Sequence, residues 1–156
     1  MAIAITLQQY LDSNGIRYDV MPHGYTNSSM NTAEAAKVPG DQLAKSIILE
    51  DEDGYLMAVL PATHHVEIGR LSQQLNRKLG LATESEIARL FTDCELGAIP
   101  PVGEAYGMEM IMEDSLSTCE DVYFEGGDHT DIVHVHGEDF KRLMRTAMHG
   151  QFSRHL

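Results

Sequence analysis

The stretch QLAKSIILEDEDGYLMAVLPA, at positions 42–62, constrains the fold of this chain more than any other part. Two apolar, partly β-branched runs flank an acidic turn that ends with Asp53-Gly54. This pair of residue types favours a tight turn between antiparallel strands. The stretch therefore predicts a β-hairpin.

Shorter elements surround the hairpin in an irregular order. Alternating or apolar runs predict strands in IRYDVMPH (16–23), MEMIM (108–112), DVYFEGG (121–127) and IVHVH (132–136). Helical spacing predicts helices within 6–14, 31–38, 68–75, 83–91 and 138–149. Thr6 and Asn31 are the expected N-caps of the first two helices, and Thr83 with Glu86 forms a capping box. The irregular order predicts one α+β domain over residues 1–156 with a mixed or largely antiparallel sheet.

The composition is typical of a globular chain without a membrane segment. Of 156 residues, 43% are hydrophobic and 22% are charged, and no apolar run is long enough to span a bilayer. The start, MAIAITLQQYLDSNG, lacks the basic and apolar regions of a signal peptide, so we expect a cytoplasmic protein. Cys94 and Cys119 are too few for a disulfide framework and are expected to stay reduced.

The formal net charge is −13, from 24 acidic and 11 basic residues. Tight non-specific binding to a phosphate backbone needs a basic footprint, so we expect no DNA partner. Small basic groups at 70–89 and 141–145 remain, either as local patches or as solvated helix faces.

Lys45 stands among apolar residues in the first strand of the hairpin. Strand alternation places it on the same face as Ile47 and Leu49. A buried ammonium needs a partner, so two interpretations are open. The side chain extends its head to water, or it lies at the floor of a pocket and binds a phosphate or polarises a carbonyl.

The segment DCELGAIPPVG, at 93–103, favours neither a helix nor a strand. Gly97 permits backbone conformations and close approaches that a side chain forbids. Pro100 and Pro101 fix two φ angles and hold the segment extended. Such a loop presents its backbone groups to a ligand with little entropy left to lose. The alternative is an ordinary rigid connection between a helix and a strand.

The remaining polar residues favour no separate catalytic centre. His134 and His136 share a strand face and, with His129, could hold a metal. No acid or cysteine stands beside them at a typical ligand spacing, so we predict no metal, and we expect no cofactor. Cys94 lies between two acids, whose charges raise a thiol pKa and disfavour a nucleophile. The sequence contains no Ser-His-Asp order, P-loop or Gly-x-Gly-x-x-Gly motif.

Three segments together resemble the YbaK and prolyl-tRNA synthetase editing-domain family of small aminoacyl-tRNA deacylases. They are positions 31–71, 81–103 and 122–144, and the resemblance covers about residues 18–144. Its marks are the lysine of LAKS, the strand end LPA, the Gly-x-x-x-Pro pattern of GAIPP and the late GGDH.

The resemblance implies a compact α+β fold around a twisted, largely antiparallel sheet with flanking helices. It also implies hydrolysis of the ester that joins a wrong amino acid to the 3′ adenosine of a tRNA. In the family a lysine, matched by Lys45, holds the terminal nucleotide chiefly through its phosphate. The glycine–proline loop, matched by residues 97–101, places backbone groups around the ester. Water attacks with help from the terminal hydroxyl of the tRNA, so no side-chain nucleophile is needed.

On this resemblance the expected catalytic residues are Lys45, Gly97 and Pro101. The expected substrate-binding residues are His23, Thr32, Ala98, Ile99, Pro100, Gly103, Gly127 and His129. The sequence departs from the family pattern in two places. Glu125 and Gly126 stand where relatives carry small residues, and Val102 stands where many carry phenylalanine.

Two functions are open at this point. The favoured one is a free-standing trans-editing deacylase that removes a small amino acid, such as alanine or cysteine, from a mischarged tRNA(Pro). Its partners are the aminoacyl-tRNA 3′ end and, as a candidate, prolyl-tRNA synthetase. The alternative is a non-catalytic module, in signalling for example, that binds a nucleotide-like or aminoacyl-like ligand in the same pocket. The sequence does not name the amino acid, because one methylene is worth only about 1–3 kcal/mol in a pocket.

Overall fold

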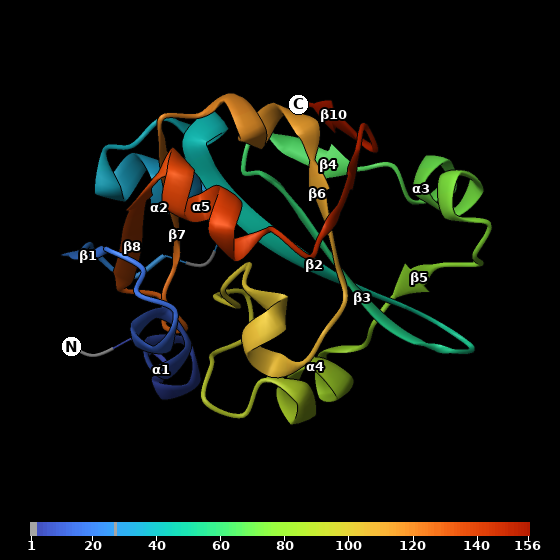
Figure 1. The fold of residues 1–156 in the computed structure, drawn as a ribbon, viewed down its shortest axis with the longest axis horizontal. Helices are drawn as coiled ribbons and strands as arrows, with labels where there is room; N and C mark the ends of the chain where they lie inside the picture. Colours follow the sequence, from blue (N-terminus) through green and yellow to red (C-terminus); the bar gives the residue numbers. More distant parts are fainter. Residues whose placement is uncertain (1–2, 27) are drawn as a thin grey trace.

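The computed structural model describes residues 3–26 and 28–156, and a mixed sheet forms its centre (Figure 1). In the described part of the chain, the strands follow the order β1-β8-β7-β2-β3-β6-β9, and β5 pairs with β2. Their bounds are β1 Asp19–Pro22, β2 Leu43–Asp51, β3 Gly54–Pro61, β5 Gly80–Leu81, β6 Met110–Glu113, β7 Asp121–Glu125, β8 Asp131–His136 and β9 Met148–Gly150. A separate small sheet pairs β4, His64–Val66, with β10, Ser153–His155.

The predicted hairpin is confirmed and forms the long strands at the middle of the sheet (Figure 1). β2 and β3 pair antiparallel from Ala44 opposite Pro61 to Asp51 opposite Gly54. The Asp51 carboxylate closes the turn by accepting hydrogen bonds from the amides of Asp53, at 2.9 Å, and Gly54, at 3.1 Å. The acidic turn residues therefore act through their own backbone bonds.

Parallel pairing on either side of the hairpin makes the sheet mixed. β2 runs parallel to β7, and β3 runs parallel to β6. Ala44 lies opposite Phe124 in the first of these pairs. Lys45 and Glu125 come next on the two strands, and side chains at matched positions of neighbouring strands share a face. The register therefore brings a lysine and a glutamate to one region of the sheet.

Helices cover the two faces of the sheet. They are α1 Ile5–Ser13, α2 Ser29–Ala36, α3 Ile68–Leu75, α4 Glu84–Leu90 and α5 Gly137–Leu143. Buried residues of α1 and α5 join the main apolar core, together with side chains of β2, β3, β7 and β8. Leu71 of α3 packs in a second core with Phe152 and apolar residues of β2 and β3. No helix in the described residues is long and apolar enough to cross a membrane.

Two predicted helix starts are wrong, whereas the capping box of Thr83 and Glu86 is confirmed. Ser28 caps α2 in place of Asn31, because its hydroxyl accepts a hydrogen bond from the Asn31 amide at 3.1 Å. α1 begins at Ile5, and Thr6 is not its cap. The Thr6 amide donates instead to Oδ2 of Asp93, at 2.8 Å, so a distant loop residue satisfies this helix end.

The predicted C-terminal helix is too long. α5 ends at Leu143, and the chain then forms β9, parallel to β6. Met148, within the predicted helix, therefore lies in a strand. Phe152 is fully buried beyond it, and its amide donates to Oε2 of Glu113 at 2.9 Å. Sheet pairing and this burial outweigh the helical spacing of the sequence.

Candidate functional site

A cavity of about 640 Å³ lies between β2, α4 and the loop of residues 93–103. Its charged and hydroxyl-bearing lining residues are Ser28, Lys45, Ser46, Glu84 and Glu125. Leu96, Gly97 and Ile99 of the loop line another part of it. This volume and this mixture of apolar walls with a few polar groups are typical of a small-molecule site.

Lys45 lies on β2 and lines this cavity half-buried. Its Nζ donates a hydrogen bond to the carbonyl of Ala62 at 3.4 Å. Burial lowers the pKa of Lys45, and no charged group of the described residues contributes to that shift. The ammonium is therefore not neutralised by an acid and can meet an anionic group of a ligand.

Leu96, Gly97 and Ile99 of the 93–103 loop form another wall of the cavity. Hydrogen bonds hold this part of the loop to the rest of the fold. The Ser46 hydroxyl donates to the carbonyl of Ile99 at 2.8 Å. The Glu95 amide donates to the carbonyl of Gly127, also at 2.8 Å. Gly97 adopts φ +84°, which a side chain disfavours, and a Cβ there would lie 3.2 Å from Cε1 of His129. Both the backbone conformation and the close histidine therefore favour glycine here.

Four of the predicted loop residues lie away from the cavity. Ala98, Pro100, Pro101 and Gly103 are buried and are not among its lining residues. A Cβ on Gly103 would lie 2.7 Å from Cγ of Met110, so this glycine permits close packing against β6. These four predicted site residues therefore anchor the loop in the fold, and the cavity wall is made by their neighbours.

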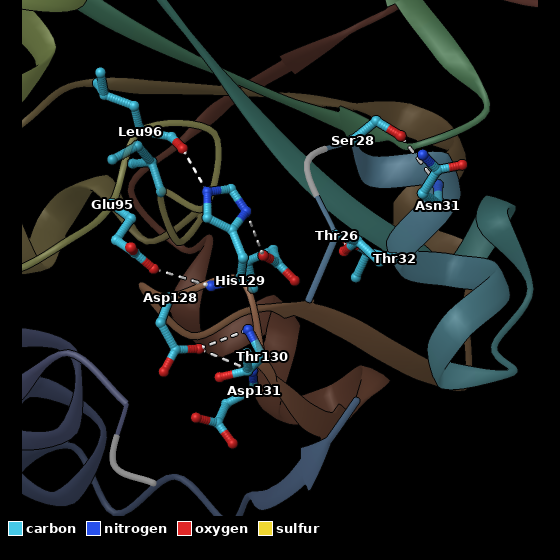
Figure 2. A network of polar contacts seen from close by, with 12 residues as sticks. Thr26, Ser28, Asn31, Thr32, Glu95, Leu96, Asp128, His129, Thr130 and Asp131 are labelled. Carbon is cyan, nitrogen blue, oxygen red and sulfur yellow. Dashed lines mark hydrogen bonds and ion pairs between the residues drawn. The ribbon is translucent and has the colours of Figure 1, made fainter. Parts of the chain in front are cut away.

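His129 links the β7–β8 connection to the loop (Figure 2). Its Nε2 lies 2.7 Å from the carbonyl of Leu96, and its backbone amide donates to Oε2 of Glu95 at 3.3 Å. Asp128 fixes the turn that contains His129, because its Oδ1 accepts hydrogen bonds from the amides of Thr130 and Asp131. Gly127 adopts φ +112°, and a Cβ there would lie 2.7 Å from that of Ala4. His129 is buried and lies directly behind Gly97.

His23 and Thr32 lie behind the cavity and do not line it. The His23 ring has no exposed surface, and its Nδ1 lies 2.6 Å from the carbonyl of Gly24. Its Nε2 lies 3.2 Å from Oε1 of Glu125. Thr32 is 2% exposed, and its hydroxyl contacts that of Thr26 (Figure 2). These residues support the site through their neighbours.

Glu125, at the end of β7, lines the cavity and was not among the predicted site residues. Its side chain is 9% exposed. Burial raises the pKa of Glu125 to about 8, and the negative charges of Asp128, Asp131 and Glu95 add to the rise. The sequence carries a signal for this residue, because alternation in VYFE places an acid on the same face as Tyr123 of a buried strand.

The histidines of β8 do have a nearby acid, contrary to the prediction from sequence spacing. Antiparallel pairing of β7 with β8 brings Asp121 opposite His136. Its Oδ1 lies 2.8 Å from Nε2 of His134 and 3.5 Å from Nδ1 of His136. His129 lies elsewhere, at the cavity loop. The spacing rule missed Asp121 because the strands, not the chain order, bring it close.

The environment of Cys94 disfavours its thiolate form. Burial raises the pKa of its thiol to about 12, and the nearby Asp93 adds to the rise. The direction confirms the expectation from the sequence, but burial is the larger cause. Its Sγ lies 3.2 Å from the hydroxyl of Tyr106.

One family model matches most of this chain. The model of the aminoacyl-tRNA editing domain matches residues 23–143. No curated protein matches the sequence significantly. A solved candidate trans-editing enzyme for prolyl-tRNA synthetase is 20% identical with a TM-score of 0.85, over 97% of this chain and 96% of its own.

Two further solved structures share the fold. A hypothetical protein is 17% identical with a TM-score of 0.83, over 96% of this chain and 99% of its own. A candidate signal transduction protein from Marinobacter aquaeolei VT8 is 19% identical with a TM-score of 0.77. That match covers 97% of this chain but 31% of the longer protein. At these identities the structures establish the fold alone.

Proposed function

Because this chain belongs to the aminoacyl-tRNA editing domain family, we propose that it is a deacylase that hydrolyses the ester of a mischarged tRNA. One observation carries the proposal. A lysine without an acidic partner and a glycine loop line the same cavity, which is large enough for a terminal nucleotide and a small aminoacyl group.

Lys45 binds the phosphate of the terminal nucleotide and fixes the position of its ribose. An ammonium on a strand suits this role, because it is a compact charge at a defined depth in the cavity. The loop then lies against the ester. The amides of Glu95 and Ala98 donate hydrogen bonds to backbone carbonyls, but the Gly97 amide donates none within the described part of the chain. That amide can donate to the ester carbonyl as negative charge develops on its oxygen.

Hydrolysis then requires no covalent intermediate. Water attacks the carbonyl with help from the free ribose hydroxyl of the tRNA, and the cavity contributes position and polarisation. The thiol of Cys94, kept protonated by its burial, agrees with a mechanism that lacks a nucleophilic side chain.

The proposed substrate is a small amino acid, such as alanine or cysteine, on tRNA(Pro). The fold similarity to a candidate trans-editing enzyme for prolyl-tRNA synthetase supports this choice. The protein would act in the cytoplasm, free-standing or beside the synthetase. Its net charge of −13 favours binding of the tRNA 3′ end alone, with few contacts to the rest of the tRNA.

The test is single-turnover hydrolysis of Ala-tRNA(Pro), Cys-tRNA(Pro) and Ser-tRNA by wild type, Lys45→Ala and Lys78→Ala. Lys78 is an exposed lysine outside the cavity and controls for the loss of one positive charge. We expect Lys45→Ala to lose about 10²-fold or more in rate with unchanged unfolding, as for loss of one key electrostatic group. Lys78→Ala should keep the wild-type rate.

Wild-type turnover by Lys45→Ala would show that the lysine has no catalytic role. A folded wild type that hydrolyses no member of the panel would favour the second candidate, a binding module that uses the same cavity. The similarity of the fold to part of a candidate signal transduction protein supports that alternative.

A further inference from the structure

Glu125 has a buried carboxyl group that the proposed mechanism does not use. Its Oε1 faces Nε2 of His23, but its Oε2 is buried and has no hydrogen-bond partner within the described part of the chain. A carboxyl oxygen buried without a hydrogen-bond partner is costly and calls for an explanation, and a ligand is one that its place in the cavity allows. Because Glu125 lines the cavity, the missing donor can come from a ligand.

The two neighbouring histidines cannot supply that donor while they are neutral. Nδ1 of His23 must donate to the carbonyl of Gly24, which leaves a lone pair on Nε2. Nε2 of His129 likewise donates to the carbonyl of Leu96, which leaves a lone pair on Nδ1. This Nδ1 lies 3.9 Å from Oε2 of Glu125. Two acceptor atoms therefore face each other without a proton donor between them.

A group with several N–H donors and a positive charge can bridge two such acceptors from the side. Glu125 lines the same cavity as Gly97 and Lys45, and the His129 ring lies next to it, behind Gly97. A ligand that carries an anion for Lys45, an ester for the loop and a cation for Glu125 matches all three. The aminoacyl ester of a 3′-terminal nucleotide has these groups in that order.

On the basis of the proposed function, we propose that Glu125 and His129 form a subsite for the α-ammonium group of the aminoacyl ester. Oε2 of Glu125 and Nδ1 of His129 accept its N–H groups. The subsite requires a free α-amine, so it excludes esters whose amine is acylated. It also positions the carbonyl carbon, because the α-carbon joins the ammonium to the ester.

The subsite predicts proton release on binding. In the free protein the pKa of Glu125 is raised to about 8, and an ammonium beside the carboxyl would lower it. The charged or titratable groups that act on or contact this carboxyl are His23, Glu95, Asp128, His129 and Asp131, and the hydroxyl of Thr32 opposes the rise. Below its raised pKa, the carboxyl therefore loses a proton when the ammonium binds.

The experiment compares two non-hydrolysable amides by calorimetry with the intact chain. They are 3′-deoxy-3′-(L-alanylamino)adenosine 5′-phosphate and its propionylamino counterpart, which lacks only the α-amine. At about pH 6.5, where the amine is charged, we expect wild type to prefer the first by about tenfold or more and to release protons on binding. Glu125→Gln should bind both compounds equally, without proton release.

Glutamine is the matched replacement because it keeps the size of the side chain and an N–H donor for His23. Chemical unfolding confirms that this variant is folded. Glu84→Gln makes the same change in the other acid of the cavity, and we expect it to retain the preference.

Equal binding of both amides by wild type would overturn the subsite and leave the proposed function intact. Loss of the preference in Glu84→Gln, with its retention in Glu125→Gln, would assign the ammonium to Glu84 and overturn the inference. If wild type binds neither amide, the proposed function and the subsite fail together.

Discussion

Replacing Glu125 with glutamine should change how the stability of the protein depends on pH. The side chain is nine-tenths buried, and the pKa of its carboxyl is raised to about 8. In the unfolded chain the same group titrates near the ordinary value for glutamate, about 4.3. Between these two values the folded protein binds one proton that the unfolded chain does not. The contribution of Glu125 to stability therefore falls as pH rises through this window.

The size of the effect follows from the linkage between proton binding and folding. One proton bound only in the folded state changes the free energy of unfolding by about 1.4 kcal/mol for each pH unit. Between about pH 5 and pH 7, wild type should lose about 3 kcal/mol relative to Glu125→Gln, because glutamine does not titrate. Other ionisable groups are common to both proteins and largely cancel in the difference.

Urea unfolding of both proteins across this pH range measures the difference, provided that their m-values agree. Glu52→Gln, in the exposed turn between β2 and β3, is the matched control, because that carboxyl stays in water in both states. A difference between wild type and Glu125→Gln that stays constant with pH would refute the reasoning. It would mean that the folded carboxyl ionises in the ordinary range, as in an ion pair with a protonated His23.

Two further predictions concern a glycine and an ion pair. Gly97→Ala should lower the free energy of unfolding by about 1–2 kcal/mol and slow deacylation, because alanine disfavours φ +84° and its Cβ would press on His129; urea unfolding and single-turnover kinetics measure both. Normal values for both would contradict this. Arg77→Gln should raise the pKa of the Asp51 carboxyl above its value of about 2, because Nε of Arg77 lies 2.6 Å from that carboxyl. An unchanged carboxyl titration by NMR would exclude this pair as the cause.

The sequence predicted well those elements whose structure depends on residues close together along the chain. The β2–β3 hairpin follows from two apolar runs around Asp53-Gly54, and α4 follows from the capping box of Thr83 and Glu86. In each case the residues that determine the structure are a few positions apart. The irregular order of the predicted elements indicated the α+β class and a mixed sheet, which the structure confirms. The family resemblance, which the match to residues 23–143 confirms, implied the same class.

The elements that the sequence predicted wrongly depend on distant partners. At the start of the first helix, the carboxylate of Asp93 accepts a hydrogen bond from the Thr6 amide. Only the tertiary fold brings these two residues together. The last predicted helix is shortened because 148–150 pairs with β6. Asp121 joins His134 and His136 through strand pairing, so spacing along the chain could not find it. Strand alternation marks Glu125 as buried, but its partners His23, Thr32 and Glu95 lie far along the chain, so the sequence alone did not place it in the site.

The glycine and the prolines of the 93–103 loop have different structural roles. The first half turns at φ +84° against His129, and glycine adopts this conformation with the least strain. The second half must cross the core without unpaired amides, and Pro100 and Pro101 have none to bury. The Ser46 bond to the Ile99 carbonyl joins the halves to the strand that carries Lys45. The glycine therefore shapes the cavity wall, and the Ser46–Ile99 bond ties that wall to the strand of the lysine.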